Sequence, residues 1–199
     1  AIEKPGYLER TWQRVREEVE KGRQVYVVCP RISSAGQTSV DLDGLESVLD
    51  LANADGPAAP MANVEDVMEE LAGGQLAGLR LGALHGRMSA EDKDAAMRRF
   101  AAGPMAGDGL DVLVSTTVIE VGVDIPNASV MVVMDADRFG VSQLHQLRGR
   151  VGRGGLPGLC LLVTNAQAGS PARERLDAVA ATTDGFELSK VDLMARREG

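Results

Sequence analysis

The chain has 199 residues, of which 44% are hydrophobic and 25% charged, the composition of a globular protein with one full core. Its formal net charge of −8 argues against indiscriminate nucleic-acid binding but is compatible with a local basic groove. No apolar stretch approaches the roughly 18 residues that a membrane span needs, and the two cysteines form no metal-binding motif. We therefore expect a cytoplasmic protein that has no metal site and no contact with a membrane.

The first third of the chain predicts one helix, one strand and one insertion. Apolar residues recur at helical spacing from Tyr7 to Lys21, and the β-branched run QVYVVCP at 24–30 predicts a buried strand. Between 33 and 62 the sequence becomes rich in Gly, Ala and Asp. This composition predicts a long, partly mobile insertion with one short helix at 45–51.

After residue 62, helices and strands alternate. Asn63 is placed to cap one helix, and Ser89 begins a capping box that opens another. The strands are apolar throughout, which is typical of a parallel sheet buried on both faces. The sequence therefore predicts an α/β fold with helices on both faces of a parallel sheet, built from helices at 64–76, 89–100, 141–149 and 172–181 and strands at 79–84, 110–115, 129–135 and 159–164.

Three polar loops leave predicted strands at their carboxyl ends. They cover 84–88, 115–126 and the stretch from Asp135 into the helix at 141–149. Because ligands of open parallel sheets gather at the carboxyl ends of the strands, we expect these loops to converge on one rim.

The most informative segment is the run QLRGRVGR at 146–153, which holds Arg150 and Arg153 three residues apart. Three residues are roughly one helical turn, so we expect the two side chains to emerge on one helix face. Arginine keeps its charge, and its planar fork fits phosphate oxygens. Such a pair suits the charge that develops on a transferring phosphoryl group.

The chain lacks the elements that would hold a nucleotide by themselves. A P-loop needs GxxxxGK[ST], and no Gly-Lys-Ser or Gly-Lys-Thr occurs. Asp135 and Asp137 follow an apolar strand, but their sequence is not the DExH pattern that would hold Mg²⁺. We therefore expect the chain alone to be inactive as an ATP hydrolase.

Three further segments allow both a functional and a structural interpretation. The triplet 115–117 could bind phosphate oxygens or form a turn and cap. Asp124 could accept a hydrogen bond from a ribose hydroxyl or be a solvated loop acid. The turn at 85–87 could contact DNA or serve only as a connection, with Gly86 permitting a close backbone approach.

Taken jointly, VLVSTTVIEVGVDIPNAS and DADRFGVSQLHQLRGRVGRG resemble motifs V and VI of superfamily 2 helicases and translocases. The sequences of these segments resemble the RecG family of branch-migration helicases. So do GRQVYVVCP at 22–30 and LHGRMSAEDKDAAMRRF at 84–100. The transcription-repair coupling translocases are the alternative. Either resemblance implies a RecA-like second motor domain, of the P-loop NTPase type but without a P-loop.

The resemblance also assigns residue roles. It implies that Arg150 and Arg153 are catalytic and reach ATP, which is held with Mg²⁺ mainly by a missing N-terminal motor domain. The residues implied for the nucleotide side are Gln146, Gly149, Gly122 and Asp124. The residues implied for DNA are Ser115, Thr116, Thr117, His85, Gly86, Arg87 and Arg196.

The resemblance further predicts the domain organisation and the partners. Residues 1–165 form the motor domain, and 166–199 form a helical extension with the start of a translocation hairpin, where Arg197 replaces a usual glycine. The chain lacks an initiator methionine, so we expect it to be part of a longer protein. The implied partners are branched DNA and the chain's own N-terminal motor and wedge domains, in a monomer. A non-enzymatic binding module and an RNA-directed helicase lobe remain alternatives.

Overall fold

A computed structural model describes residues 2–3, 8–30, 62–116, 125–153 and 155–182. The predicted insertion lies outside these residues apart from its last position, Ala62, and so does the predicted hairpin segment. Within them, six strands form one sheet in the order β1-β6-β5-β2-β4-β3, and every pairing is parallel. The strands are β1 (Ile2–Glu3), β2 (Gln24–Val28), β3 (Leu81–Leu84), β4 (Val112–Ser115), β5 (Ala128–Val133) and β6 (Leu159–Val163).

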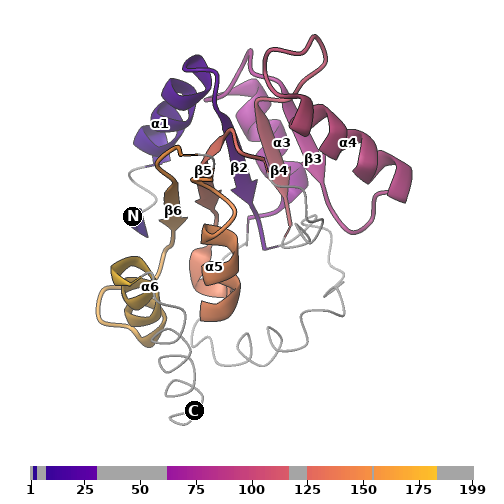
Figure 1. The fold of residues 1–199 in the computed structure, drawn as a ribbon. Helices are drawn as coiled ribbons and strands as arrows, with labels where there is room; N and C mark the ends of the chain where they lie inside the picture. The colour runs from indigo at the N-terminus through magenta and orange to yellow at the C-terminus, as the bar shows by residue number, and fades with distance from the viewer. Residues whose placement is uncertain (1, 4–7, 31–61, 117–124, 154, 183–199) are drawn as a thin grey trace.

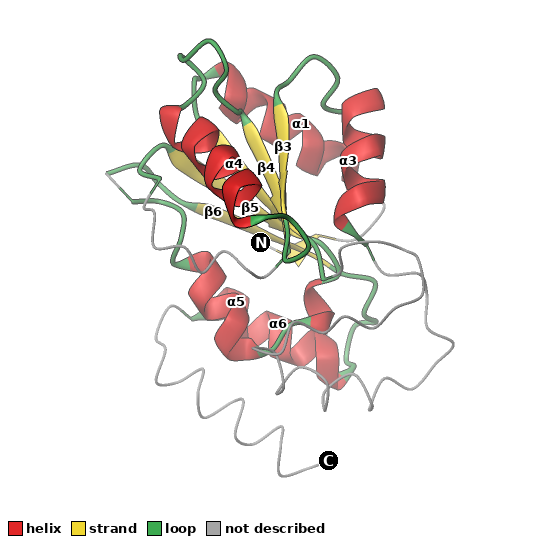
Figure 2. Cartoon of the chain, turned by 90° about the vertical axis from the view of Figure 1, so that its right-hand side faces the viewer, coloured by secondary structure: helices red, strands yellow, loops and turns green. Residues whose placement is uncertain are grey.

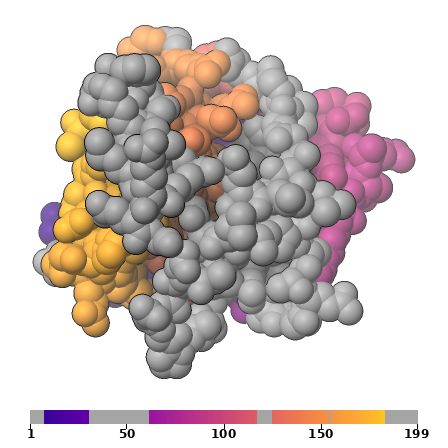
Figure 3. All heavy atoms as spheres, turned by 90° about the horizontal axis from the view of Figure 1, so that it is seen from below, coloured from indigo at the N-terminus to yellow at the C-terminus, as the bar shows by residue number. Residues whose placement is uncertain are grey.

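The helices cover both faces of this sheet, as the sequence predicts (Figures 1 and 2). One apolar cluster joins α1 and α3 to one face, and a second joins α4, α5 and α6 to the other. Seen from below, α6 in yellow lies on the left and the magenta segments lie on the right (Figure 3). The helices are α1 (Leu8–Glu20), α3 (Val64–Gly73), α4 (Ala90–Ala102), α5 (Val141–Arg148) and α6 (Pro171–Ala181), with a 3₁₀ turn η3 (Ala136–Arg138) before α5.

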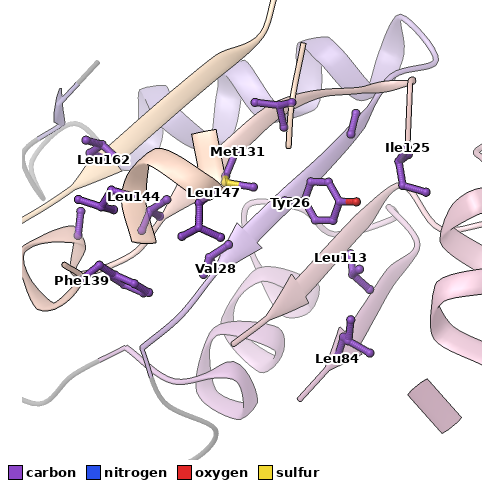
Figure 4. Close-up of a cluster of buried hydrophobic side chains, with 14 of the residues drawn as sticks. Tyr26, Val28, Leu84, Leu113, Ile125, Met131, Phe139, Leu144, Leu147 and Leu162 are labelled. Carbon is purple, nitrogen blue, oxygen red and sulfur yellow. The ribbon is translucent and has the colours of Figure 1, made fainter. Parts of the chain in front are cut away.

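Strand β2 is the centre of the core. All five of its residues are buried, and successive side chains alternate between the two clusters because a strand has a period of two. Tyr26 and Val28 face the α4–α5 side (Figure 4), where the Tyr26 ring meets Phe100 of α4 edge-on at 4.9 Å between centroids. Val25 and Val27 face α1 and α3.

Both predicted helix caps are present, whereas the short strand β1 was not predicted from the sequence. Asn63 and Ser89 accept hydrogen bonds from Asp66 N and Asp92 N, which confirms both predicted helix starts. The two-residue β1 pairs with β6 but is too short to produce a periodic pattern. None of the described helices is long and apolar enough to cross a membrane.

A buried carboxylate ties α1 to the sheet. The Glu18 side chain is 3% exposed and forms ion pairs with Lys21 at 2.8 Å and Arg23 at 2.6 Å. It also accepts a hydrogen bond from Ser129 of β5 at 3.1 Å. Burial by itself raises the pKa of Glu18, but the hydrogen bonds from Lys21, Arg23 and Ser129 and the charge of Arg23 outweigh it and lower the pKa to about 2.

This depressed pKa makes the free energy of unfolding depend on pH. The contribution of Glu18 is fully present above its unfolded-state pKa of 4.5 and is lost as the pH falls toward 2. We expect it to be roughly 2 kcal/mol, discounted because Lys21 is half exposed. Urea unfolding between pH 6 and pH 2.5 should show a smaller loss of stability in Glu18→Gln than in the parent. Glu17→Gln, which alters an exposed neighbour, should follow the parent, and identical pH profiles for all three proteins would contradict this role.

Candidate functional site

The carboxyl ends of β2, β3 and β4 are fixed side by side at one rim. The N–H of Thr116 donates to the Leu84 carbonyl at 3.2 Å, and the N–H of Cys29 donates to the Ser115 carbonyl at 2.8 Å. The structure therefore brings the turn that begins at His85 next to the 115–116 pair, as the sequence predicts. Thr117, the last member of the predicted triplet, lies outside the described residues.

Two hydroxyl groups at this rim stand out. Ser115 is 0% exposed and Thr116 is 4% exposed, and neither hydroxyl has a hydrogen-bond partner within the described part of the chain. A buried polar group that lacks a partner costs about 1–3 kcal/mol. The structure thus shows no turn or cap hydrogen bond from either hydroxyl within the described residues, and the phosphate-binding interpretation of this pair stays a prediction.

The turn after β3 is held by an unusual set of bonds. The N–H of His85 donates to the Met88 sulfur at 3.4 Å, and the N–H of Met88 donates back to the His85 carbonyl at 3.2 Å. From α4, the Lys93 ammonium donates to the Gly86 carbonyl at 3.1 Å. These bonds join the two ends of the turn and tie it to α4, and Arg87 is exposed on it.

Asp135 and Asp137, beyond the carboxyl end of β5, have structural partners. Asp135 adopts a left-handed conformation with φ of 45°, and its carboxylate accepts from the Ala62 N–H at 2.7 Å. Burial is the main cause that raises the pKa of Asp135. Asp137 accepts from the Thr164 hydroxyl at the end of β6. These partners agree with the absence of a DExH motif at this strand.

The arginine pair does not lie where the sequence suggested. Helix α5 ends at Arg148, so Arg150 and Arg153 follow the helix and do not share a helical face. The N–H of Gly152 donates to the carbonyl of Ala128, the first residue of β5, at 3.2 Å. The pair therefore lies toward the amino end of β5, about 17 Å of strand from the rim. The three predicted loops do begin at one rim, since the ends of β3, β4 and β5 are joined there through β2, but the arginines lie away from it because they follow α5.

The segment that carries the pair is closed by a contact between two glycine backbones. A Cβ on Gly152, whose φ is +77°, would lie 2.6 Å from Gly158 Cα, and a Cβ on Gly158 would lie 2.8 Å from Gly152 Cα. This close approach brings 152 and 158 together at the base of the loop that follows Arg153. Arg153 is exposed and donates from Nε to the Gly149 carbonyl at 2.8 Å. Gln146 and Gly149 are exposed as well, so the predicted nucleotide side is open.

The remaining predicted nucleotide residues, Gly122 and Asp124, lie outside the described residues. Their neighbour Ile125 is buried in the same apolar cluster as Val151, one of the two residues between the arginines. Arg196, predicted to contact DNA, also lies outside the described residues.

Sequence reasoning missed Arg148, the first arginine of the QLRGRVGR run. Its Nη1 donates to the carbonyls of Val179 and Thr182 at 2.5 and 2.6 Å, and its Nη2 lies 3.1 Å from His145 Nδ1. Arg148 therefore caps the end of α6 and ties α6 to α5. Its position in the last turn of α5 marks it as a helix-end cation, but nothing in the sequence identifies its partners.

A groove of about 510 Å³ lies between α5, α6 and β6, and Cys160 lines it beside Arg148 and Val179. Burial raises the pKa of the Cys160 thiol to about 11 and also raises that of Cys29. Neither Cys29 nor Cys160 forms a disulfide, and with these raised pKa values both thiols are protonated near pH 7.

The class of protein follows from comparison with known sequences. The chain belongs to the family described as the helicase conserved C-terminal domain, whose sequence profile matches residues 8–155. That match includes the rim residues and both arginines of the 150–153 pair.

Individual relatives narrow the likeness further. An ATP-dependent DNA helicase RecG from Mycobacterium bovis is 52% identical over 197 residues, which cover 99% of this chain and 24% of that protein. RecG from Bacillus subtilis is 39% identical over 192 residues, which cover 96% and 24%. The predicted resemblance to RecG is confirmed, and the chain spans about a quarter of the length of the curated relatives it matches.

Solved structures give the same result. A structure of RecG bound to a three-way DNA junction matches with a TM-score of 0.69 at 37% identity, over 96% of this chain and 21% of that one. Domain 2 of the DEAD-box helicase Mss116p, bound to an RNA duplex, matches with a TM-score of 0.55 at 13% identity, over 98% and 67%. The second likeness is one of fold alone, and it confirms the predicted RecA-like helicase architecture.

The contact between the two glycines can be tested against a matched control. Gly152→Ala and Gly155→Ala both place a side chain at positive φ, which costs about 1–2 kcal/mol. Only at 152 would the new Cβ also meet backbone atoms, whereas nothing lies within 4 Å at 155. Chemical denaturation should therefore show a clearly larger loss of stability for Gly152→Ala. Equal losses would mean that the loop base opens without cost.

Proposed function

We propose that this chain is the second motor domain of an ATP-dependent DNA helicase of the RecG type, which remodels branched DNA such as stalled forks and junctions. The observation that carries the proposal is the 52% identity to RecG over 99% of the chain. The match to RecG bound to a three-way junction supports the choice of a branched substrate.

The nucleotide role is assigned to the amino-end arginines. The sequence that carries Arg150 and Arg153 contains no P-loop motif. In this proposal, ATP and Mg²⁺ are therefore held mainly by a preceding motor domain. Arg153 is exposed and precedes a loop whose base is closed at 152 and 158. From there the pair stabilises the charge that develops on the transferred phosphoryl group. The proposal assigns Gln146, Gly149, Gly122 and Asp124 to the same nucleotide, as the resemblance implies.

The DNA role is assigned to the carboxyl rim. Phosphate oxygens would satisfy the buried hydroxyls of Ser115 and Thr116, which have no partner within the described part of the chain. The hydrogen-bonded turn at 85–87 adds a backbone surface and the exposed Arg87, and Thr117 and Arg196 are assigned to the same set. Because the net charge is −8, binding is confined to this local patch and does not spread over the surface.

The separation of the two residue sets supports a motor function. The segment 117–124 follows Thr116, at the carboxyl end of β4, and precedes Ile125, which belongs to the same apolar cluster as Val151 of the arginine segment. One stretch of backbone therefore joins the DNA set to the nucleotide set. In the proposed cycle, ATP binding closes the two motor domains on each other, and hydrolysis reopens them.

An alternative assignment within the same class is the motor lobe of a transcription-repair coupling translocase. The 52% identity to RecG favours the RecG assignment over it. A helicase lobe that acts on RNA has support only from a likeness of fold at 13% identity.

The arginine assignment predicts a specific defect. In the intact helicase, Arg153→Ala should lower DNA-stimulated ATP turnover by about 10³–10⁵, since that is the usual cost of losing an arginine finger. Binding of a three-way junction, measured by fluorescence anisotropy, should stay nearly unchanged. Arg98→Ala removes an exposed arginine from α4 and should keep full turnover. Near-normal turnover in Arg153→Ala would defeat the assignment.

A second experiment separates an enzyme from a binding module. The chain alone should not hydrolyse ATP, whereas mixing or fusing it with its N-terminal half should restore ATPase activity that branched DNA stimulates. A non-enzymatic module would bind its target but remain inactive in every combination. Stronger activation by structured RNA than by a three-way DNA junction would instead favour an RNA helicase.

A further inference from the structure

In the turn between β3 and α4, the carbonyl of Gly86 accepts a hydrogen bond from a side chain outside the turn. His85 and Met88 bond to each other through backbone and sulfur, and this internal pairing leaves the Gly86 carbonyl for another donor. The Lys93 ammonium supplies that donor at 3.1 Å. Without it, the peptide group between Gly86 and Arg87 would be free to rotate, because glycine has no Cβ to restrict it.

The position of Lys93 in its helix calls for an explanation. Lys93 lies in the second turn of α4, four residues after the Ser89 cap, and its backbone N–H donates to the Ser89 carbonyl. A cation near the amino end of a helix opposes the helix dipole. Glu91, Asp92 and Asp94 surround it in sequence, but no ion pair joins Lys93 to them among the described contacts. In the described part of the chain, the Lys93 side chain has one hydrogen-bond partner, the backbone carbonyl of Gly86.

We propose that Lys93 is a positioning residue for DNA binding, which fixes the Gly86 peptide and thereby orients Arg87 toward a backbone phosphate. The inference rests on the proposed function, in which the turn at 85–87 contacts DNA. Lys93 itself touches no phosphate in this account and acts through the turn. Without the Lys93 side chain, one backbone residue of the turn would have to be ordered when DNA binds. This cost corresponds to about 5- to 30-fold weaker DNA binding.

The alternative role, direct contact of Lys93 with a phosphate, has a different salt dependence. A cation that neutralises one phosphate of duplex DNA adds about 0.9 to the slope of log K against log salt concentration. A positioning residue changes the affinity but leaves that slope unaltered. The slope therefore distinguishes the two roles even where the loss of affinity is the same.

The experiment uses the full-length helicase and a three-way DNA junction. Lys93→Met removes the donor and the charge, and Lys93→Arg keeps both. Arg87→Ala removes the phosphate contact itself, and Arg98→Met is the control for loss of an exposed cation on the same helix. We expect Lys93→Met to raise the half-saturating junction concentration in the ATPase assay 5- to 30-fold, with kcat and the salt slope unchanged. Lys93→Arg should restore most of the affinity, and Arg98→Met should match the parent.

A double variant completes the test. If Lys93 acts through Arg87, Lys93→Met should add little further loss in an Arg87→Ala background, because the contact it serves is already gone. Additive losses would overturn the inference, and so would a reduced salt slope in Lys93→Met. If Lys93→Met binds the junction with parental affinity while Arg87→Ala binds it more weakly, the positioning role of Lys93 is refuted. The role of the turn in DNA binding would then still stand. Parental affinity and slope in Arg87→Ala would show that the turn does not bind DNA, so that the proposed role of this turn fails with the inference.

Discussion

Burial of β2 on both faces is the constraint on which the rest of the structure depends. Every side chain of this strand is covered, so apolar helices must lie on each side and polar groups can be placed only where strands begin or end. The two ends of the sheet differ in how these polar groups are satisfied. At the start of β2, the buried Gln24 amide donates to the carbonyls of Phe100 and Leu110 at 2.6 and 2.8 Å. At the end of β4, the buried hydroxyls of Ser115 and Thr116 lack partners within the described residues.

In the proposed function, the two ends of one domain have different roles. The rim after β3 and β4 offers hydroxyls and a braced turn, and the loop near the start of β5 offers two guanidinium groups. In the proposed motor, the stretch between Thr116 and Ile125 connects these two ends along the sequence. Arg148 ties α6 to α5 by donating to the carbonyls of Val179 and Thr182.

The sequence was sufficient for the fold because its signals were local. Continuously apolar strands predicted the parallel sheet, and Asn63 and Ser89 marked helix starts that the structure confirms. The placement of Arg150 and Arg153 failed because sequence spacing does not reveal where a helix ends. It ends at Arg148, two residues before the pair. The hydrogen bonds of the Lys93 and Arg148 side chains could not be predicted either, because every residue type has a backbone carbonyl and the sequence does not show which one is the partner. The roles of the site residues themselves remain predictions.

The contact between Gly152 and Gly158 has a consequence for how this sequence can change over time. Most tight contacts can tolerate a larger residue on one side if a smaller one appears on the other. Here both partners already lack a side chain, and either new Cβ would come within 3 Å of the opposing backbone. No compensating exchange exists, so among relatives the two positions should be fixed independently and show no correlated substitution. Gly155, which has open space around it, should accept residues such as asparagine that tolerate positive φ.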